Sequence, residues 1–384
     1  MSHVSDPLFQ HFSFAKGLNL RNRIVMAPMT TWSSNDDETI SEQELAWYRA
    51  RAKGAGLVLT GCTHVQPSGV GFTNEFAAYD DRFMPSLRAL AQAAKSGGAK
   101  AVLQIFHAGN KAVPDLVPNG ELVSASELAA PAGPFNDGKL ASRALSHDEI
   151  LALIHDFGEA TRRAIEAGFD GVELHGAHGF LLQNFLSPLF NQRTDEWGGS
   201  LEKRMRFPLA VVREVHRVIA AHAKGPFLLG YRISPEEPGE GALRIDDALA
   251  LVDRLIAEGH ADYLHASLYN LLAGQSQDDA SGMTTVQRFV ERVAGRIPLM
   301  AAGEIRTPDQ ARQALALGLP LVAVGRSLAM NPNWVELAQA GQDEGIKTAL
   351  NLSAEPAIFS IPDRLWQVIQ QLPGWFPASE PVQG

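Results

Sequence analysis

The feature that most constrains this chain is an eightfold alternation of short apolar runs with amphipathic helical segments. Each run is almost continuously aliphatic, which is typical of parallel strands buried on both faces. The runs cover residues 23–28, 57–62, 101–106, 171–175, 227–233, 262–267, 298–304 and 321–325. Eight such repeats predict an α/β fold, a closed (β/α)8 TIM barrel. An open doubly wound sheet is the alternative, but no G-x-G-x-x-G motif follows the first run.

Two of the intervening helices carry explicit start signals. Ser146 and Glu149 form a capping-box pattern, and Thr307 with Pro308 predicts the N-cap and first turn of a later helix. The apolar residues of the first of these helices recur at Leu151, Ile154, Phe157 and Ala164.

Two segments fall outside the repeat. About forty residues rich in Pro, Gly and Ala separate the third run from Ser146, which predicts an insertion that covers the barrel mouth. Residues 341–384 predict a C-terminal helical extension that covers the barrel or meets a partner subunit in a homo-oligomer. We therefore expect one domain over residues 1–384, with the barrel at about 20–340.

Composition limits the kinds of binding partner and the cellular compartment that we expect. The 384 residues include 33 basic and 43 acidic side chains, a net charge of −10, with no Lys/Arg cluster of the kind that binds nucleic acid. No apolar run approaches the roughly 20 residues that span a bilayer, and the N-terminus lacks a secretory signal pattern. Cys62 is the only cysteine, so no intramolecular disulfide can form. We expect a cytoplasmic protein that binds a small molecule, not nucleic acid or a membrane.

Polar residues gather at the carboxyl ends of the runs, the end at which barrels of this class place their active sites. Their convergence on one rim favours a working site over surface decoration. These residues are Pro28, Met29 and Thr30 after the first run, Gln104 and His107 at the third, His175 and His178 at the fourth, Arg232 at the fifth, His265 and Ser267 at the sixth, and Gly303, Gly325 and Arg326 at the seventh and eighth.

The loops after the seventh and eighth runs predict a phosphate site. Gly303 and Gly325 leave backbone N–H groups accessible beside a helix start, and Arg326 adds a bidentate cation. The alternative is that these glycines merely turn the chain.

Two polar groups inside apolar runs need partners. A guanidinium at Arg232 is costly to bury alone, so it pairs either with Glu173 on the neighbouring run or with a cofactor that becomes anionic. Burial cost favours the cofactor. The Gln104 amide also needs partners, and the edge of a heterocycle would supply both donors and acceptors.

His175 and His178 stand three residues apart in "HGAHGF", and three interpretations are open. The pair could bind zinc, although no third ligand lies nearby in the sequence. The two imidazoles could be core or capping residues. They could also be neutral donors that hold one carbonyl oxygen and stabilise the negative charge that develops on it.

The stretch "HGAHGFLLQNFLSPLFNQRTDEWGGSLEKRMRFPL" resembles the Old Yellow Enzymes, or NADH:flavin oxidoreductases, which are FMN-dependent barrels. The stretches "RNRIVMAPMT", "LQIFHAGNK", "AAGEIRTP" and "VGRSLAMNPNW" resemble the family too, so the similarity runs from about Pro7 to Pro332. It implies that hydride passes from NADH or NADPH, through FMN, to an electron-poor acceptor. The implied acceptors are quinones, nitro compounds, nitrate esters and activated alkenes.

Carried over position by position, the resemblance implies a role for each rim residue. Thr30 would bond near the flavin C4 carbonyl, Cys62 would offer its backbone, and Gln104 would read the pyrimidine edge. Arg232 would lie beside N1 and the C2 oxygen, where negative charge gathers on reduction. The remaining cofactor residues would be Pro28 and Met29, with Gly303, Gly325 and Arg326 at the phosphate.

The resemblance also implies that His175 and His178 bind the substrate oxygen. The chain departs from the family pattern at Phe180. The family usually has Tyr there, which donates a proton to the substrate α-carbon. Either water or a side chain of the loop 107–145 replaces that donor, or the enzyme favours acceptors that need no proton on carbon. From this departure we expect the second alternative. The other residues expected in the substrate pocket are Trp32 and His265.

Two further function classes stay open at this point. A non-catalytic barrel that binds a phosphorylated ligand predicts a colourless protein. A metal-dependent barrel hydrolase predicts bound metal and loss of activity with a chelator.

Overall fold

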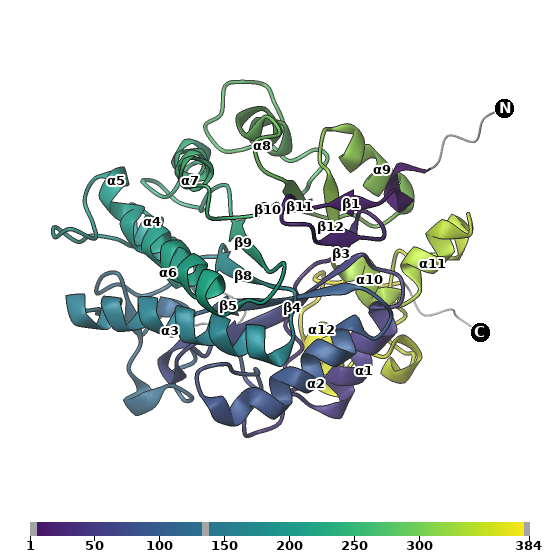
Figure 1. The fold of residues 1–384 in the computed structure, drawn as a ribbon, viewed down its shortest axis with the longest axis horizontal. Coiled ribbons are helices and arrows are strands. Elements are labelled where there is room, and N and C mark those ends of the chain that lie inside the picture. The colour runs from purple at the N-terminus through teal and green to yellow at the C-terminus, as the bar shows by residue number, and fades with distance from the viewer. Residues whose placement is uncertain (1–5, 133–137, 380–384) are drawn as a thin grey trace.

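The computed structural model describes residues 6–132 and 138–379, and eight parallel strands close into a barrel at its centre (Figure 1). The strands pair in chain order and the last pairs with the first, so the predicted (β/α)8 barrel is confirmed. All eight predicted runs are strands. They are β3 (Ile24–Met26), β4 (Leu57–His64), β5 (Lys100–Phe106), β8 (Gly171–Gly176), β9 (Leu228–Ile233), β10 (Tyr263–Ser267), β11 (Leu299–Ala302) and β12 (Leu321–Val324).

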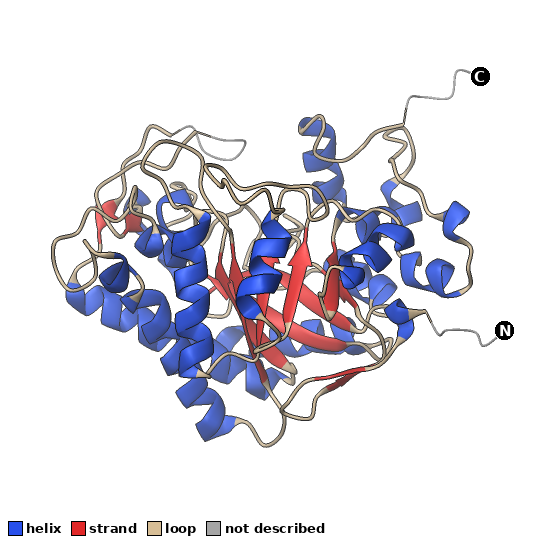
Figure 2. Ribbon diagram, turned by 90° about the horizontal axis from the view of Figure 1, so that it is seen from above, coloured by secondary structure: helices blue, strands red, loops and turns tan. Residues whose placement is uncertain are grey.

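Helices follow the strands and enclose them (Figure 2). Within the described residues, no helix is both long and apolar enough to cross a lipid bilayer. The enclosing helices are α1 (Glu42–Arg51), α2 (Met84–Lys95), α3 (His147–Ala167), α6 (Arg206–His222), α7 (Ile245–Glu258), α8 (Thr285–Val293), α9 (Pro308–Ala316), α10 (Arg326–Met330) and α11 (Trp334–Gln339).

The predicted helix starts are correct, and the apolar repeat noted for α3 coincides only in part with its buried face: Phe157 and Ala164 are buried. Ser146 and Glu149 form the capping box, and Thr307 caps α9 with Pro308 in its first turn. Leu151, another position of the repeat, is 47% exposed. The buried residues Ile150 and Leu153 precede Phe157 by seven and four positions, the spacing that places side chains on one helix face.

An N-terminal hairpin closes the amino end of the barrel. Its strands β1 (Phe12–Ser13) and β2 (Asn19–Leu20) pair antiparallel. Its apolar residues form one buried cluster with residues near the starts of the barrel strands. Because this end is filled, the carboxyl ends of the strands are left for a site. The cluster includes Phe14, Leu18, Leu20, Leu57, Leu228 and Leu321.

The predicted insertion between β5 and α3 reaches the barrel mouth. It contains two 3-10 turns, η4 (Gly109–Lys111) and η5 (Pro118–Gly120), and the short strands β6 (Val123–Ser124) and β7 (Arg143–Ala144). Lys111, Pro131 and Ala132 line a cavity there, which confirms the covering role. Part of this insertion, 133–137, lies outside the described residues. After β8 the chain forms α4 (Leu181–Leu186) and α5 (Leu201–Arg204) before α6.

The C-terminal extension packs on the barrel, which is the first of the two positions predicted for it. It contains η6 (Asp343–Gly345), η7 (Pro356–Phe359) and α12 (Asp363–Gln371), which lies beside α1 (Figure 1). The other position, against a partner subunit, stays a prediction.

A buried arginine fastens this extension to the barrel. The Arg51 guanidinium donates to the carbonyls of Leu328 (3.0 Å), Ala329 (2.9 Å) and Phe359 (2.8 Å), and it stacks 3.4 Å from the Trp47 ring centroid. Burial lowers its pKa well below the ordinary value. Carbonyls from α10 and η7 therefore converge on one side chain of α1.

We expect Arg51→Met to lower the free energy of unfolding by about 3 kcal/mol or more, because it leaves several buried carbonyls without a donor. Urea unfolding measures the change, and limited proteolysis should show the extension released first. Arg49→Met is the matched control on the same helix, since Arg49 is about half exposed and pairs only loosely with Glu42. Equal stability of the two variants would contradict the clamp.

Candidate active site

A cleft lies at the carboxyl ends of the barrel strands and consists of three cavities that share wall residues. The rim cavity, of about 350 Å³, lies over the ends of β11 and β12 and includes Gly303 and Gly325. The inner cavity, of about 510 Å³, shares Met29 and Arg232 with it. The outer cavity, also about 510 Å³, meets the other two at His178.

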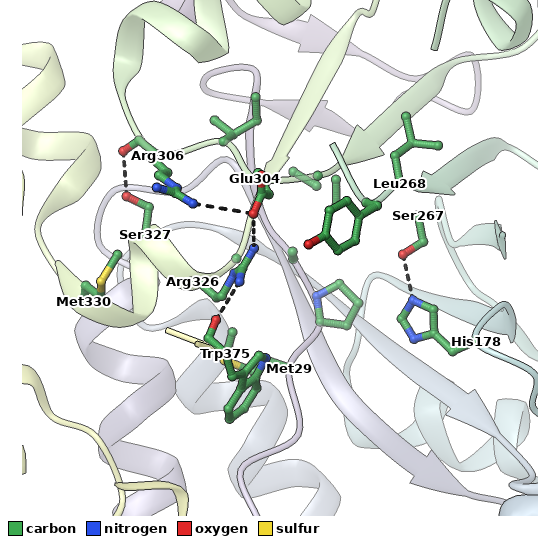
Figure 3. A pocket seen from close by; sticks show the side chains of 18 of the residues that line it. Met29, His178, Ser267, Leu268, Glu304, Arg306, Arg326, Ser327, Met330 and Trp375 are labelled. Carbon is green, nitrogen blue, oxygen red and sulfur yellow. Dashed lines mark hydrogen bonds and ion pairs between the residues drawn. The ribbon is translucent and has the colours of Figure 1, made fainter. Parts of the chain in front are cut away.

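The rim cavity is the predicted phosphate region, and it holds charges that the sequence reading missed. Arg326 donates to the carbonyl of Trp375 (2.5 Å) and to the carboxylate of Glu304 (3.3 Å), which also meets Arg306 (3.5 Å) (Figure 3). Two guanidinium groups against one carboxylate leave a net positive charge, which suits an anion. Packing also requires glycine at position 303, because a Cβ there would lie 2.8 Å from a backbone nitrogen of the neighbouring loop.

The inner cavity brings together most of the other predicted residues. Residues from the loop after β3 and from four barrel strands meet there, together with Trp375 of the C-terminal extension. The predicted residues that line it are Pro28, Met29, Thr30, Trp32, Cys62, Gln104, His175, His178, Phe180 and Arg232.

A buried carboxylate lies beneath the inner cavity. Glu173 accepts hydrogen bonds from Gln104 Nε2 (2.7 Å) and from the Tyr263 hydroxyl (3.0 Å), and it lies 3.0 Å from His265 Nδ1. Burial alone would raise the pKa of Glu173, but His265 and Arg232 together bring it below the ordinary value, so the group stays anionic.

This network corrects the expectation for two predicted residues. His265 lines none of the three cavities, because it is fully buried as the partner of Glu173; its placement in the substrate pocket was wrong. Gln104 does line the inner cavity, but its amide already has protein partners. One is Glu173, and the other is the Cys62 thiol, 3.6 Å from its oxygen.

Cys62 contributes a protonated thiol to the cavity wall. Burial raises the pKa of this thiol, so it stays protonated. The pairing of β4 with β5 shifts register between Leu59 and Cys62. Gly61 sits in this bulge and lets the strand approach Met29 closely, since a Cβ there would lie 2.6 Å from the Met29 carbonyl.

Arg232 retains a hydrogen-bond donor for a ligand. One of its terminal nitrogens donates to Ser267 Oγ (3.0 Å), while its Nε is buried with no hydrogen-bond partner among the described residues. No direct ion pair joins it to Glu173, whose oxygens are held by other side chains. Burial lowers the pKa of Arg232 and Glu173 opposes this. A buried unpaired N–H is costly until an acceptor arrives, which supports the cofactor interpretation.

The two histidines face each other as neutral side chains. Their ring centroids are 5.0 Å apart, with the planes at 75°. The Ala177 N–H donates to His175 Nδ1 (3.3 Å), which leaves the proton on Nε2 as a donor. His178 Nε2 bonds Ser267 Oγ (2.7 Å). Desolvation by the surrounding protein atoms first, and nearby positive charge second, hold the pKa of each imidazole well below its ordinary value. The His175 ring is buried, whereas His178 is exposed at the mouth of the cleft.

The outer cavity begins at His178 and runs along the loop that follows it. Phe180 forms part of its wall, and the ring packs against Phe106 (5.0 Å between centroids) and His175 (4.9 Å). Lys111 and Phe72 also line it, and the sequence reading singled out neither. In the described part of the chain, no three His, Cys, Asp or Glu side chains are grouped to hold a metal ion.

Comparison with known proteins gives the same family from sequence and from fold. The model of the NADH:flavin oxidoreductase / NADH oxidase family matches residues 7–344. A Bacillus subtilis protein named "Probable NADH-dependent flavin oxidoreductase YqiG" is 44% identical over 98% of this chain and 99% of its own length. The NADH:fumarate oxidoreductase of Klebsiella pneumoniae is 36% identical over 94% of this chain, which spans 39% of that protein.

Two solved structures share the barrel. Morphinone reductase in complex with tetrahydroNAD has a TM-score of 0.75 and 28% identity, over 93% of this chain and 96% of that one. An old yellow enzyme homologue from Zymomonas mobilis has a TM-score of 0.75 and 26% identity, over 87% of this chain and 92% of that one.

We expect nitrogen-15 NMR at pH 7 to find His175 and His178 neutral, with the His175 proton on Nε2. His64 is the internal contrast in the same spectrum. Burial would lower its pKa, but Glu38 and Glu75 on its two ring nitrogens raise it to about 9, so it should carry both protons. A doubly protonated imidazole at His175 or His178 would contradict this account of the cleft.

Proposed function

The chain belongs to the NADH:flavin oxidoreductase / NADH oxidase family, with the Old Yellow Enzyme barrel, and from that premise we propose that it reduces an electron-poor acceptor held by His175 and His178. It is an FMN-dependent oxidoreductase that uses reduced nicotinamide. This assignment replaces the phospho-ligand-binding barrel and the metal-dependent hydrolase. The observation that carries the proposal is the meeting of neutral histidines and an incompletely bonded Arg232 in one cleft.

The residues of the cleft fit FMN in both charge and shape. The rim cavity, with Arg306 and Arg326, would take the phosphate, and the inner cavity would take the flavin ring against Pro28, Met29 and Thr30. Bound FMN supplies the chemistry of hydride transfer. Arg232 would place its free N–H and its positive charge where the reduced ring is anionic, which stabilises the reduced cofactor.

The histidine pair would orient the acceptor. A neutral imidazole donates a hydrogen bond without repelling the positive charge of Arg232, and His175 presents Nε2–H because Ala177 occupies Nδ1. His178 Nε2 is bonded to Ser267, so Nδ1 is the nitrogen that His178 would offer to a ligand. A donor from each imidazole on one oxygen would stabilise the negative charge that develops there during reduction. Quinones, nitro compounds, nitrate esters and activated alkenes all place charge on an oxygen, and we propose acceptors of this group.

A phenol tests the oxygen site because phenolate binds the same donors and reports its position by a charge-transfer band with the flavin. We expect His178→Ala to raise the Kd of para-substituted phenols by about 10- to 100-fold in the oxidised holoenzyme, the loss for a hydrogen bond to a charged group. Visible absorbance measures the titration.

The matched control is His260→Ala, at a histidine whose ring contacts that of His216 (4.4 Å between centroids) and lines none of the three cavities. This variant should bind phenols as the wild type does. Equal Kd values for His178→Ala and the wild type would remove His178 from the proposed oxygen site.

A further inference from the structure

We propose that Lys111 donates the proton to the carbon of a bound acceptor. It would replace the tyrosine that the family usually has at the position of Phe180. The inference rests on the proposed function. It replaces the preference for proton-free acceptors that the sequence alone favoured, because the insertion after β5 brings an acidic N–H to the cleft.

The Lys111 ammonium group lies beside the histidine loop. Its Nζ donates to the His178 carbonyl (2.6 Å) and lies 5.9 Å from the centroid of the Phe180 ring. Gly179 leaves the room for it, since a Cβ at that position would lie 2.8 Å from Nζ. The lysine therefore reaches the same part of the cleft as residue 180, from a different loop.

A buried amide holds the two loops in register. Asn184, on α4, accepts from the Asn110 N–H (3.3 Å) and donates from Nδ2 to the Gly179 carbonyl (3.0 Å). The Leu181 N–H also donates to the His107 carbonyl (3.0 Å). The backbone that precedes Lys111 is thus bonded to the residues that follow His178 and Phe180, and this constrains the position of the donor.

The charges around Lys111 favour a proton donor over an anchor for an anionic substrate. Glu236 and Glu237 line the same cavity, so a carboxylate ligand would meet two negative charges there. Glu237 is itself fixed by Gln183 (2.8 Å) and Ser187 (2.5 Å). Burial lowers the pKa of Lys111, with Glu237 opposing, and a lysine with a lowered pKa releases its proton more readily.

The proton balance is simple for an activated alkene. A hydride adds to the β-carbon, and the electron pair of the C=C bond moves toward the α-carbon and the oxygen held by the histidines. One N–H bond of Lys111 breaks and a C–H bond forms at the α-carbon. The neutral amine then regains a proton from water.

Rapid mixing of the reduced holoenzyme with cyclohexenone or with a benzoquinone separates the two kinds of acceptor. We expect Lys111→Met to lower the ratio of the enone rate to the quinone rate by about 10²- to 10⁴-fold, the usual contribution of a positioned general acid. Lys111→Arg should lower the ratio of the enone rate to the quinone rate to a similar extent, because a guanidinium keeps its charge but does not release its proton. An anion anchor would instead be preserved by arginine.

The matched control is Lys203→Met. Lys203 also donates to a backbone carbonyl, that of Asp195 (3.2 Å), but lies outside the cleft. Its variant should keep the wild-type ratio. A readout independent of turnover is competitive acetylation of the apoprotein followed over pH, in which the pKa of Lys111 should lie below the ordinary value of a lysine side chain, because burial lowers it.

An unchanged ratio in Lys111→Met, a ratio preserved in Lys111→Arg, or a Lys111 whose pKa is that of an ordinary lysine side chain would overturn the proposal. These outcomes are distinct from failure of the proposed function. If NADH does not reduce the bound flavin, or the reduced enzyme transfers nothing to a quinone, the function itself is wrong.

Discussion

The cleft depends on one buried carboxylate. Glu173 on β8 is bonded to Gln104 of β5 and to Tyr263 and His265 of β10, so a single anion joins strands on both sides of it. The neighbouring strand β9 carries Arg232. Glu173 compensates its positive charge without a direct ion pair to the guanidinium. Because the carboxylate is already saturated with partners, the guanidinium can be buried and still keep a donor for a ligand.

Charge is unevenly distributed along the cleft. The rim cavity has Arg306 and Arg326 beside Glu304 and suits an anion. The inner cavity has the neutral histidines, and it shares Arg232, its one cation, with the rim cavity. Desolvation first, and the positive charge of Arg232 second, lower the pKa of both histidines, so they can donate hydrogen bonds without adding charge. Burial is costly for each polar group alone, but it also keeps the histidines neutral and leaves Arg232 with a donor for a ligand.

Strand positions and rim residues were predictable because their signals are local. A buried strand shows as an apolar run, and a polar residue at its end stands out, as Arg232 and Gln104 do. The partners of those residues were not predictable, because they depend on rotamers across strands. His265 resembles a pocket residue by its position in the sequence, but its ring turns to Glu173 instead. Lys111 and Trp375 reach the cleft from an insertion and from the C-terminal extension, where no periodicity reports direction.

The most direct test of the account is the midpoint potential of the bound flavin in Arg232→Ala and Arg232→Lys. If Arg232 stabilises the anionic reduced cofactor, the alanine variant should have a more negative potential than the wild type, and the lysine variant, which keeps the positive charge, should lie between the two. Unfolding of both proteins by urea would establish that the barrel is intact. An alanine variant that is folded, holds FMN and keeps the wild-type potential would contradict the central claim that this buried cation serves the cofactor.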